Sequence, residues 1–267
     1  MTNIVVLIKQ VPDTWSERKL TTGDFTLDRE AADAVLDEIN ERAVEAALLI
    51  KEKDEAEGRD GKVVVLTLGP ERAGEAIRKA LSMGADEAMH VLDERAAGSD
   101  MVQTAWLLAN AIGQVEPPAD LVITGNQATD GTGGAVPAIV AQNLGLPQLT
   151  HMREFTVEGG KITGLRETDE GQQRLEASLP AVVSVHEKIN EPRFPSFKGI
   201  MAAKKKQVRT LTLEEIGVSA DEVGLGNAGS KVFSSVPRPA KSAGEKVSDE
   251  GDGGTKIAEY LVAQKII

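Results

Sequence analysis

The residues with the clearest capacity for chemistry lie at 122–137, where the sequence reads VITGNQATDGTGGAVP. Gly131, Gly133 and Gly134 have no side chains, so backbone N–H groups there can approach an anion closely. The N-terminus of a following helix would add positive electrostatic potential. A nucleotide pocket and an ordinary strand-to-helix turn are both consistent with this stretch. The polar side chains that could hydrogen-bond a ribose or a base are Asn126, Gln127, Thr129 and Thr132.

The sequence carries none of the common catalytic or phosphate-binding motifs. GxGxxG and G-x-S-x-G are absent, and the GTGG at 131–134 is not followed by Lys and Ser or Thr. The chain has no cysteine, which excludes disulfides and thiol catalysis. His90, His151 and His186 form no HxxxH or HExxH pair, so we expect no metal site and no catalytic residue. A binding or carrier subunit is favoured over a self-sufficient enzyme.

Alternating apolar runs and amphipathic segments must position the glycine-rich stretch. Buried strands are expected at 3–11, 62–70, near 87–91 and at 120–125, and helices at 34–53, 71–83, 100–113 and 135–144. This alternation predicts an α/β fold with a parallel sheet. Ligands of such sheets bind beyond the carboxyl ends of the strands, so the loops after Ile8, Thr67 and Thr124 should converge.

The second half of the chain has a different texture. Residues 155–189 are expected to be antiparallel, 190–208 to form a loop rich in Pro and Phe, and 255–267 to form a helix. From Val218 to about Thr255 the chain is rich in Gly, Ser and Pro and has no periodicity. We expect an α/β nucleotide-binding domain at 1–220 and an extended C-terminal arm at 221–267, which wraps a partner.

The net charge and the hydropathy of the chain argue against some classes of binding partner. A net charge of −12 argues against nucleic acid or an anionic membrane surface. The chain opens directly on a strand-like run and no segment approaches transmembrane length, so we expect a cytoplasmic protein without direct membrane insertion.

Two further segments have a functional and an ordinary interpretation. Phe194 and Phe197 lie in NEPRFPSFKG, in a protein with only 3% aromatic residues, so they either dock a partner or fold back onto their own sheet. The basic run 204–206 is either part of that surface or a solvated strand edge. TLGP at 67–70 either ends a strand or shapes one wall of an adenosine pocket.

Five segments together resemble the β subunit of electron transfer flavoprotein (ETF), over nearly the whole chain. They are VVLIKQVPD, DEINERAVEAALLIKE, TLGPERAGEAIRKALSMGADEAMHV, GNQATDG and LPAVVSVHEKINEPRFPSFKGIMAAKKK. The resemblance implies a parallel-sheet adenine-nucleotide-binding (HUP/USP-like) domain with an antiparallel addition and a partner-wrapping arm. It implies a heterodimer with an ETF α subunit, which holds most of the FAD, while this chain carries structural AMP.

The resemblance also implies a place in electron transport. The heterodimer would accept electrons from acyl-CoA dehydrogenases of fatty acid oxidation and related enzymes, and pass them to a membrane ETF–quinone oxidoreductase. By motif, the cofactor-binding residues would be Leu7, Asp37, Glu38, Ile39, Asn40, Leu68, Gly125, Asn126, Gln127, Ala128, Thr129, Asp130, Gly131, Thr132, Gly133, Gly134, Ala135 and Val136.

The glycine-rich loop departs from two patterns of the family. The respiratory form has a D-D-x-x-N-Q-T-G run, whose Asn-Gln-Thr triplet is replaced here by Gly134, Ala135 and Val136. Electron-bifurcating relatives, which hold a second FAD in place of AMP, have D-G-D-T-A-Q-V-G-P. This chain shares Asp130, Gly131 and Val136 with that pattern but lacks its second Asp, its Thr and its Gln. The resemblance favours AMP, with a second FAD as the alternative.

Docking residues also follow from the resemblance. Residues 190–201 match the family's recognition loop, so Phe197, with Phe194 and Pro195, would enter a pocket on the dehydrogenase. Glu167 matches a glutamate that helps the flavin domain to swing, or is an ordinary surface carboxylate. A stand-alone adenine-nucleotide sensor of the universal-stress type is the rival from another class.

Overall fold

A computed structural model of the chain describes residues 2–168, 170–240, 244 and 246–267. The chain divides into a compact unit that ends at Phe233 and a second unit, Ser234–Ile267. The predicted arm at 221–267 includes residues 241–243 and 245, which lie outside the described residues. In the described part, no helix has both the length and the apolar character needed to cross a membrane.

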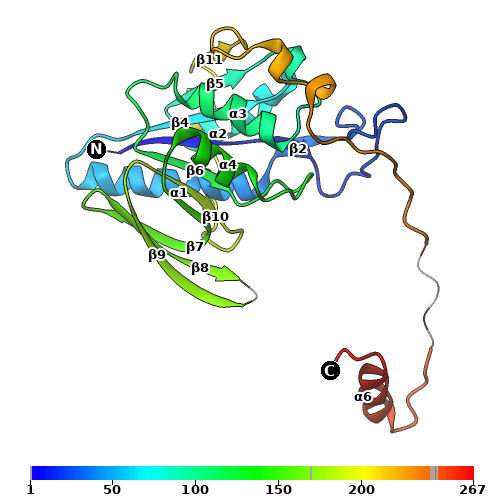
Figure 1. The fold of residues 1–267 in the computed structure, drawn as a ribbon. Coiled ribbons are helices and arrows are strands. Elements are labelled where there is room, and N and C mark those ends of the chain that lie inside the picture. The colour runs from blue at the N-terminus through cyan, green and yellow to red at the C-terminus, as the bar shows by residue number, and fades with distance from the viewer. Residues whose placement is uncertain (1, 169, 241–243, 245) are drawn as a thin grey trace. The chain divides into compact units, whose positions relative to one another are not determined.

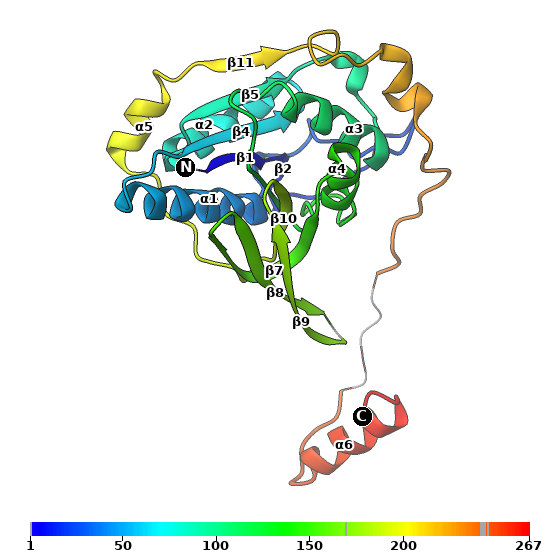
Figure 2. The same ribbon diagram turned by 60° about the vertical axis from the view of Figure 1, so that its left-hand side comes forward.

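The compact unit is built on one large, mostly parallel sheet. Within the described residues its strand order is β11-β5-β4-β1-β6-β10-β7-β8-β9 (Figures 1 and 2). The α/β prediction is confirmed. The parallel strands are β1 (Asn3–Leu7), β4 (Lys62–Leu68), β5 (Glu87–Val91), β6 (Leu121–Gly125), β10 (Ala181–Val185) and β11 (Val208–Leu211). The antiparallel addition consists of β7 (Gln148–Glu158), β8 (Lys161–Thr168) and β9 (Gly171–Ser178).

Both faces of the parallel sheet are buried, because successive side chains of a strand point to opposite faces. In β1, Ile4 and Val6 belong to one apolar cluster, and Val5 and Leu7 belong to another. Helices α1 (Glu38–Ala56), α2 (Gly74–Met83) and α5 (Phe197–Ala203) contribute to the first cluster. Helices α3 (Met101–Ile112) and α4 (Val136–Leu144) contribute to the second. Short 3₁₀ turns occur at η1 (Glu71–Ala73), η2 (Glu94–Ala96), η3 (Ala220–Glu222) and η4 (Leu225–Asn227).

Three sequence predictions need correction. Residues 34–36 do not begin the first helix. They form β3 (Ala34–Leu36), which pairs antiparallel with β2 (Gln10–Pro12), and the helix begins only after its cap, Asp37. Residues 181–185 are not antiparallel, since β10 runs parallel to both β6 and β7. The segment 190–208 is not all loop, because the Ser196 hydroxyl accepts the Gly199 N–H and starts α5.

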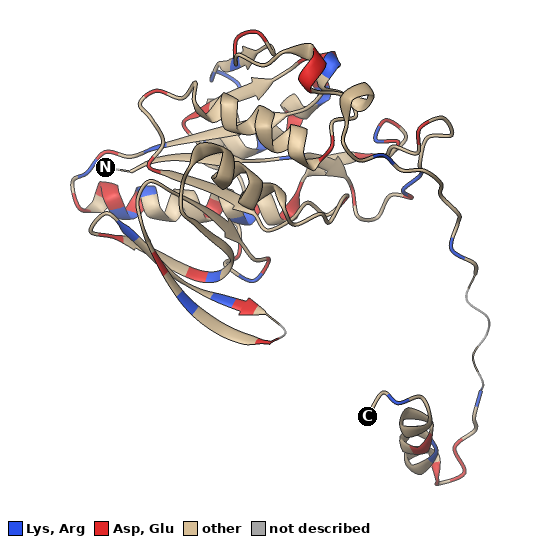
Figure 3. Ribbon diagram, in the orientation of Figure 1, with Lys and Arg blue, Asp and Glu red and all other residues tan. Residues whose placement is uncertain are grey.

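The second unit contains α6 (Gly253–Ala263), which begins two residues before the predicted helix at 255. Its apolar side chains are exposed, among them Ile257, Tyr260 and Val262. Acidic and basic residues are interspersed over β7, β8 and β9 in the first unit (Figure 3).

Candidate functional site

The carboxyl ends of β4, β1 and β6 lie side by side, as the alternation of strands and helices predicts. β1 pairs with β4 and with β6 in parallel register. The Ile8 N–H donates to the Leu66 carbonyl at 2.9 Å, and the Thr67 hydroxyl donates to the Ile8 carbonyl at 2.9 Å. The predicted convergence of the loops after Ile8, Thr67 and Thr124 is confirmed.

Asp37 connects the first helix to the glycine-rich loop. Its Oδ1 caps α1 by accepting the N–H groups of Ile39 and Asn40, at 2.9 and 3.3 Å. Its Oδ2 accepts the backbone N–H and the hydroxyl of Thr129, at 2.7 and 2.8 Å. Asp37 is fully buried, so these bonds replace water around its charge. The carboxylate is therefore hydrogen-bonded by protein donors and fixes the position of Thr129 in the loop.

A second carboxylate, Asp130, holds the middle of the same loop. It accepts Lys9 Nζ at 2.7 Å and the Arg29 guanidinium at 2.8 and 3.1 Å, and its side chain has no exposure. Burial opposes ionisation of Asp130, but the charge and hydrogen bonds of Lys9 and Arg29 outweigh it and lower its pKa. Arg18 donates to the Thr129 carbonyl at 2.6 Å. Three cations from outside the loop therefore contact it, all at Thr129 and Asp130.

Close neighbours limit a side chain at two glycines of the stretch, more strictly at Gly125 than at Gly133, whose neighbour Met101 has a flexible, exposed side chain. A Cβ at Gly125 would lie 2.7 Å from Asn40 Nδ2 and 3.0 Å from Ile39 Cγ2. A Cβ at Gly133 would lie 2.8 Å from the Met101 sulfur. Gly134, with φ of +64°, adopts the left-handed conformation that glycine favours, and Thr132 adopts it at +47°.

The loop leads directly into α4. Ala135, the residue before the helix, can offer no side-chain oxygen as a cap, and none caps α4 among the described residues. The positive end of the helix therefore faces the glycine-rich turn, although Pro137, its second residue, has no N–H to offer. Together with Lys9, Arg18 and Arg29, this arrangement suits a phosphate group.

The remaining predicted cofactor residues lie around this turn, with different exposure. Asn40 Oδ1 accepts the Lys9 N–H at 2.8 Å, and Ile39 is buried against Gly125. Leu7 is buried in the core at the end of β1, and Leu68 ends β4 half-buried. Glu38 is exposed on the first turn of α1. The loop residues Gln127 and Ala128 are half-buried, Gly131 is exposed, and Ala135 and Val136 lead half-buried into the helix.

Several residues that meet at this site have no signal in the sequence. Lys9, Arg18 and Arg29 reach the loop from 101 to 121 residues away in sequence, and no local pattern indicates such contacts. His151 also lies here: its Nδ1 is 3.4 Å from Asn126 Nδ2, and burial lowers the pKa of the imidazole. Asn126 Oδ1 is buried without a hydrogen-bond partner among the described residues.

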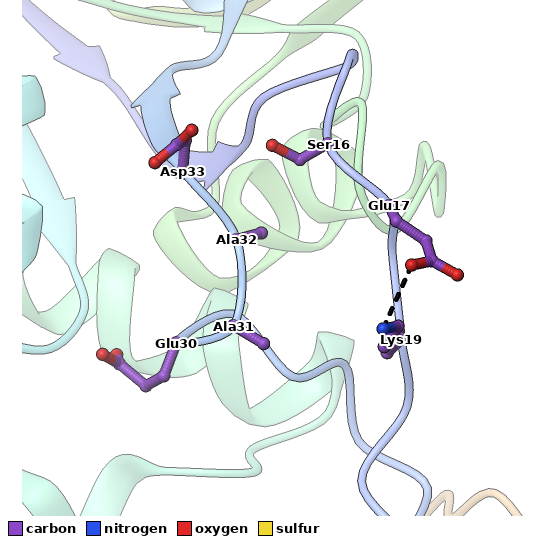
Figure 4. Close-up of a pocket in the computed structure, with 7 residues that line it drawn as sticks. All are labelled: Ser16, Glu17, Lys19, Glu30, Ala31, Ala32 and Asp33. Atoms are coloured by element: carbon purple, nitrogen blue, oxygen red, sulfur yellow. Dashed lines mark ion pairs between the residues drawn. The ribbon is translucent and has the colours of Figure 1, made fainter.

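A cavity of about 310 Å³ lies beside the segment between β2 and β3, which carries Arg18 and Arg29. Its walls come from Ser16, Glu17, Lys19 and residues 30–33, with an ion pair of 3.0 Å between Glu17 and Lys19 (Figure 4). None of its lining residues belongs to the loop 125–136, and its lining is acidic as well as basic. A second cavity, of about 610 Å³, is lined from α2, β5 and β11, including the buried His90. The loop and its cations therefore remain the better candidate for an anion site.

The predicted docking residues lie on a second surface. Phe194 is 94% exposed and Phe197, the first residue of α5, is 81% exposed, so the rings do not fold back onto the sheet. Pro195 between them is half-buried. Ile200 and Met201, on the same short helix, are also exposed.

Glu167 lies on β8 and forms an ion pair with Arg153 of the neighbouring β7. Both side chains are about two-fifths exposed. Among the described residues, no group of three or more His, Asp or Glu side chains is arranged to hold a metal ion.

Known proteins resemble this chain along its whole length. The family model for the electron transfer flavoprotein domain matches residues 24–216. The chain is 73% identical over 267 residues, all of both chains, to electron transfer flavoprotein subunit beta of Mycobacterium tuberculosis. It is 35% identical over 273 residues, 99% of each chain, to the protein of the same name from Megasphaera elsdenii. It is 36% identical over 261 residues, 98% of this chain and 97% of the other, to the caffeyl-CoA reductase-Etf complex subunit CarD of Acetobacterium woodii.

Proposed function

The chain belongs to the electron transfer flavoprotein family as a β subunit, and from that membership we propose that it binds structural AMP in the loop 125–136 and helps an α subunit to carry electrons. The observation that carries the nucleotide proposal is the position of this loop. It lies at the carboxyl end of the parallel sheet, ends at an uncapped helix and is contacted at Thr129 and Asp130 by three cations. Each feature favours a phosphate group.

The residues of the loop divide the work of binding. Asp37 and Asp130 have their carboxylates engaged by protein donors, so they hold the loop in shape. The backbone N–H groups of 131 and of 133–136 would receive the phosphate, because the Thr132 N–H already donates to the Ala128 carbonyl at 2.8 Å. Lys9 and Arg29 would help to balance its charge. Asn126, Gln127 and Thr132 would hydrogen-bond the ribose or the base, and the Thr129 hydroxyl, which donates to Asp37, would accept a hydrogen bond there.

A second FAD in place of AMP is the alternative, as in an electron-bifurcating relative. Asp130, Gly131 and Val136, shared with that loop pattern, favour this alternative. The missing second Asp, Thr and Gln favour AMP. A stand-alone nucleotide sensor is not favoured, because the full-length relatives are named as subunits.

The redox chemistry would belong to an FAD held mainly by the α subunit. A flavin can accept a pair of electrons and release them singly. The donors would be acyl-CoA dehydrogenases and related enzymes, and the acceptor a membrane ETF–quinone oxidoreductase, in the cytoplasmic compartment. The part played by this chain is to bind its partners and help to hold the flavin domain. Phe194, Pro195 and Phe197 would enter an apolar pocket of the dehydrogenase, since large exposed rings favour burial at an interface.

The arm 221–267 would wrap the α subunit. Phe233 is 97% exposed, Val236 is 85% exposed, and α6 exposes further apolar side chains. Such surface is costly to leave in water.

The experiment that tests this function is electron acceptance by the heterodimer. The chain is co-expressed with its α subunit, purified, and mixed with an acyl-CoA dehydrogenase and its acyl-CoA. We expect the flavin absorbance of the heterodimer to be bleached, and we expect no bleaching when this chain is used without its α subunit. A heterodimer that is never reduced by any acyl-CoA dehydrogenase contradicts the proposed donors.

A further inference from the structure

Arg193, at the start of the docking segment 190–203, is joined to two carboxylates of α1. Its Nε and NH2 donate to the two oxygens of Glu45, at 2.8 and 3.0 Å, in a bidentate pair. Its NH2 also donates to Glu52 at 3.1 Å, and NH1 pairs with the same carboxylate. The backbone N–H of Arg193 donates to Glu45 as well, at 3.1 Å. One guanidinium thus connects the segment to a helix 141 and 148 residues earlier in the chain.

The geometry of this pair is selective for arginine. The planar guanidinium presents several N–H groups in one fork, which matches two carboxylates at once, whereas a lysine ammonium acts as a single point of charge. Glu45 is buried, with 6% exposure, so its charge requires the pair. The hydrogen bonds of Arg193 lower the pKa of the outer partner, Glu52, against a smaller opposing effect of burial.

Other contacts fix the segment on both sides. Before Arg193, the Asn190 side chain donates to the Arg42 carbonyl of α1 at 3.0 Å. After it, α5 lies against α2 so closely that a Cβ at Gly199 would be 2.4 Å from the Ser82 carbonyl. Arg78 of α2 donates to the Ala203 carbonyl at 2.8 Å. The backbone of 190–203 is therefore held between α1 and α2.

The exposed side chains of the segment contrast with its anchored backbone. Phe194 follows Arg193 directly, and Phe197, the first residue of α5, lies four positions after Arg193. Both rings are more than four-fifths exposed, although the residues beside them are tied to two helices. A rigid backbone that presents apolar rings to solvent loses little conformational entropy when a partner binds them.

We propose that Arg193 is a positioning residue, which holds Phe194 and Phe197 in the orientation that an apolar pocket of the electron-donating partner receives. This inference rests on the proposed docking function of the segment. Arg193 itself is paired with α1 and acts through the two rings. Without the ion pairs of Arg193 with Glu45 and Glu52, the segment samples other conformations, and the partner must order it on binding.

A double-mutant cycle tests the proposal in the heterodimer with a dehydrogenase. The Michaelis constant for the heterodimer as electron acceptor is measured for Arg193→Ala, for Phe194→Ala/Phe197→Ala, and for the triple variant. We expect Arg193→Ala alone to raise it about threefold to tenfold, the cost of ordering one or two released side chains, with kcat unchanged. In the background without the rings, Arg193→Ala is expected to have no further effect.

Companion variants separate positioning from folding. Arg193→Ala/Glu45→Gln removes the buried charge that Arg193→Ala alone would leave unpaired. Glu52→Gln weakens only the more exposed of the two ion pairs of Arg193. Both variants are expected to raise the Michaelis constant. Arg193→Lys is expected to be intermediate. Arg209→Ala is the matched control, because Arg209 donates to the Gln114 carbonyl and does not contact the segment. The nucleotide content of every variant reports the fold.

The outcomes distinguish this inference from the function on which it rests. If the loss of both rings leaves the Michaelis constant unchanged, the docking function is wrong. If the ring variant is impaired but Arg193→Ala is not, or if the two effects add fully, the positioning role is wrong and docking stands.

Discussion

The carboxylate of Asp37 joins two segments 92 residues apart, since one oxygen caps α1 and the other accepts the N–H and the hydroxyl of Thr129. The conformation of the glycine-rich loop is thereby tied to the start of a 19-residue helix. A change at either residue should alter both.

Asp37→Ala is expected to release the nucleotide, because it removes the anchor of Thr129 together with the helix cap. The lost cap alone costs about 0.5–2 kcal/mol of stability. Asp100→Ala is the control: Asp100 caps α3 through the N–H groups of Val102 and Gln103 at 3.0 Å each. Both variants should lower the urea midpoint, and only Asp37→Ala should lose bound nucleotide. Equal nucleotide content in the two would contradict the anchoring role.

Gly125→Ala is expected to destabilise the protein by about 1–3 kcal/mol, because the new methyl group would overlap Asn40 and Ile39 at the start of α1. Gly131→Ala is the matched change in the same loop. No atom lies within 4 Å of its Cβ position and its φ is not positive, so little effect on folding is expected. Urea unfolding of the two heterodimers measures the difference.

Stability should depend on pH through Asp130. The folded state lowers the pKa of this carboxyl: burial opposes ionisation, but Lys9 and Arg29 outweigh it. Its contribution is therefore fully present above the unfolded pKa, about 3.9, and is lost as the pH falls through the lower folded value. The difference in unfolding free energy between wild type and Asp130→Asn should be constant from about pH 5 to 7 and shrink below about pH 4.

The comparison at each pH cancels the other carboxylates, which both proteins share. A difference that grows on acidification would reverse the assigned sign. A difference that is zero throughout would mean that Lys9 and Arg29 do not stabilise the folded loop through Asp130.

Phe197→Ala is expected to weaken coupling to the dehydrogenase and to leave the nucleotide in place. A buried aromatic anchor contributes about 2–4 kcal/mol when truncated. The ring is exposed in this chain, so its loss should not destabilise the fold. Steady-state reduction at varied heterodimer concentration measures the effect, and unchanged electron acceptance would remove Phe197 from the docking surface.

Glu167→Ala is expected to slow electron transfer without changing stability by more than about 1 kcal/mol, because exposed ion pairs contribute little. Glu176 of β9, which pairs with Lys161 of β8 in the same antiparallel addition, provides the control. Glu176→Ala should leave both properties unchanged. Stopped-flow reduction of the two variants would refute the role of Glu167 if their rates are equal.

The strands and the edge of the sheet that carries the candidate site could be predicted from the sequence because their signals are local. Runs such as VVVLTL bury both faces, and their alternation with helices dictates parallel pairing. The start of α1 was misplaced although Asp37, a strong cap, marked it. Ala34 and Val35 continue the helical spacing, and only pairing with residues 10–12 shows that they form a strand.

The contacts that shape the candidate site could be predicted only in part. The glycines and polar residues of 125–136 are contiguous, so their position after a strand is visible in the sequence. Lys9 and Arg29 meet Asp130, and Arg193 meets Glu45, through long-range ion pairs that have no periodic signal. Folding brings these charges together, and only coordinates reveal them.

The loop 125–136 is expected to hold AMP in a simple electron carrier. The most direct test is to co-purify the chain with its α subunit, denature the complex and quantify the released nucleotides by chromatography. One FAD and one AMP per heterodimer is the expected result. Two FAD and no AMP would contradict it and favour the bifurcating alternative, and one FAD alone would mean that the loop binds no nucleotide.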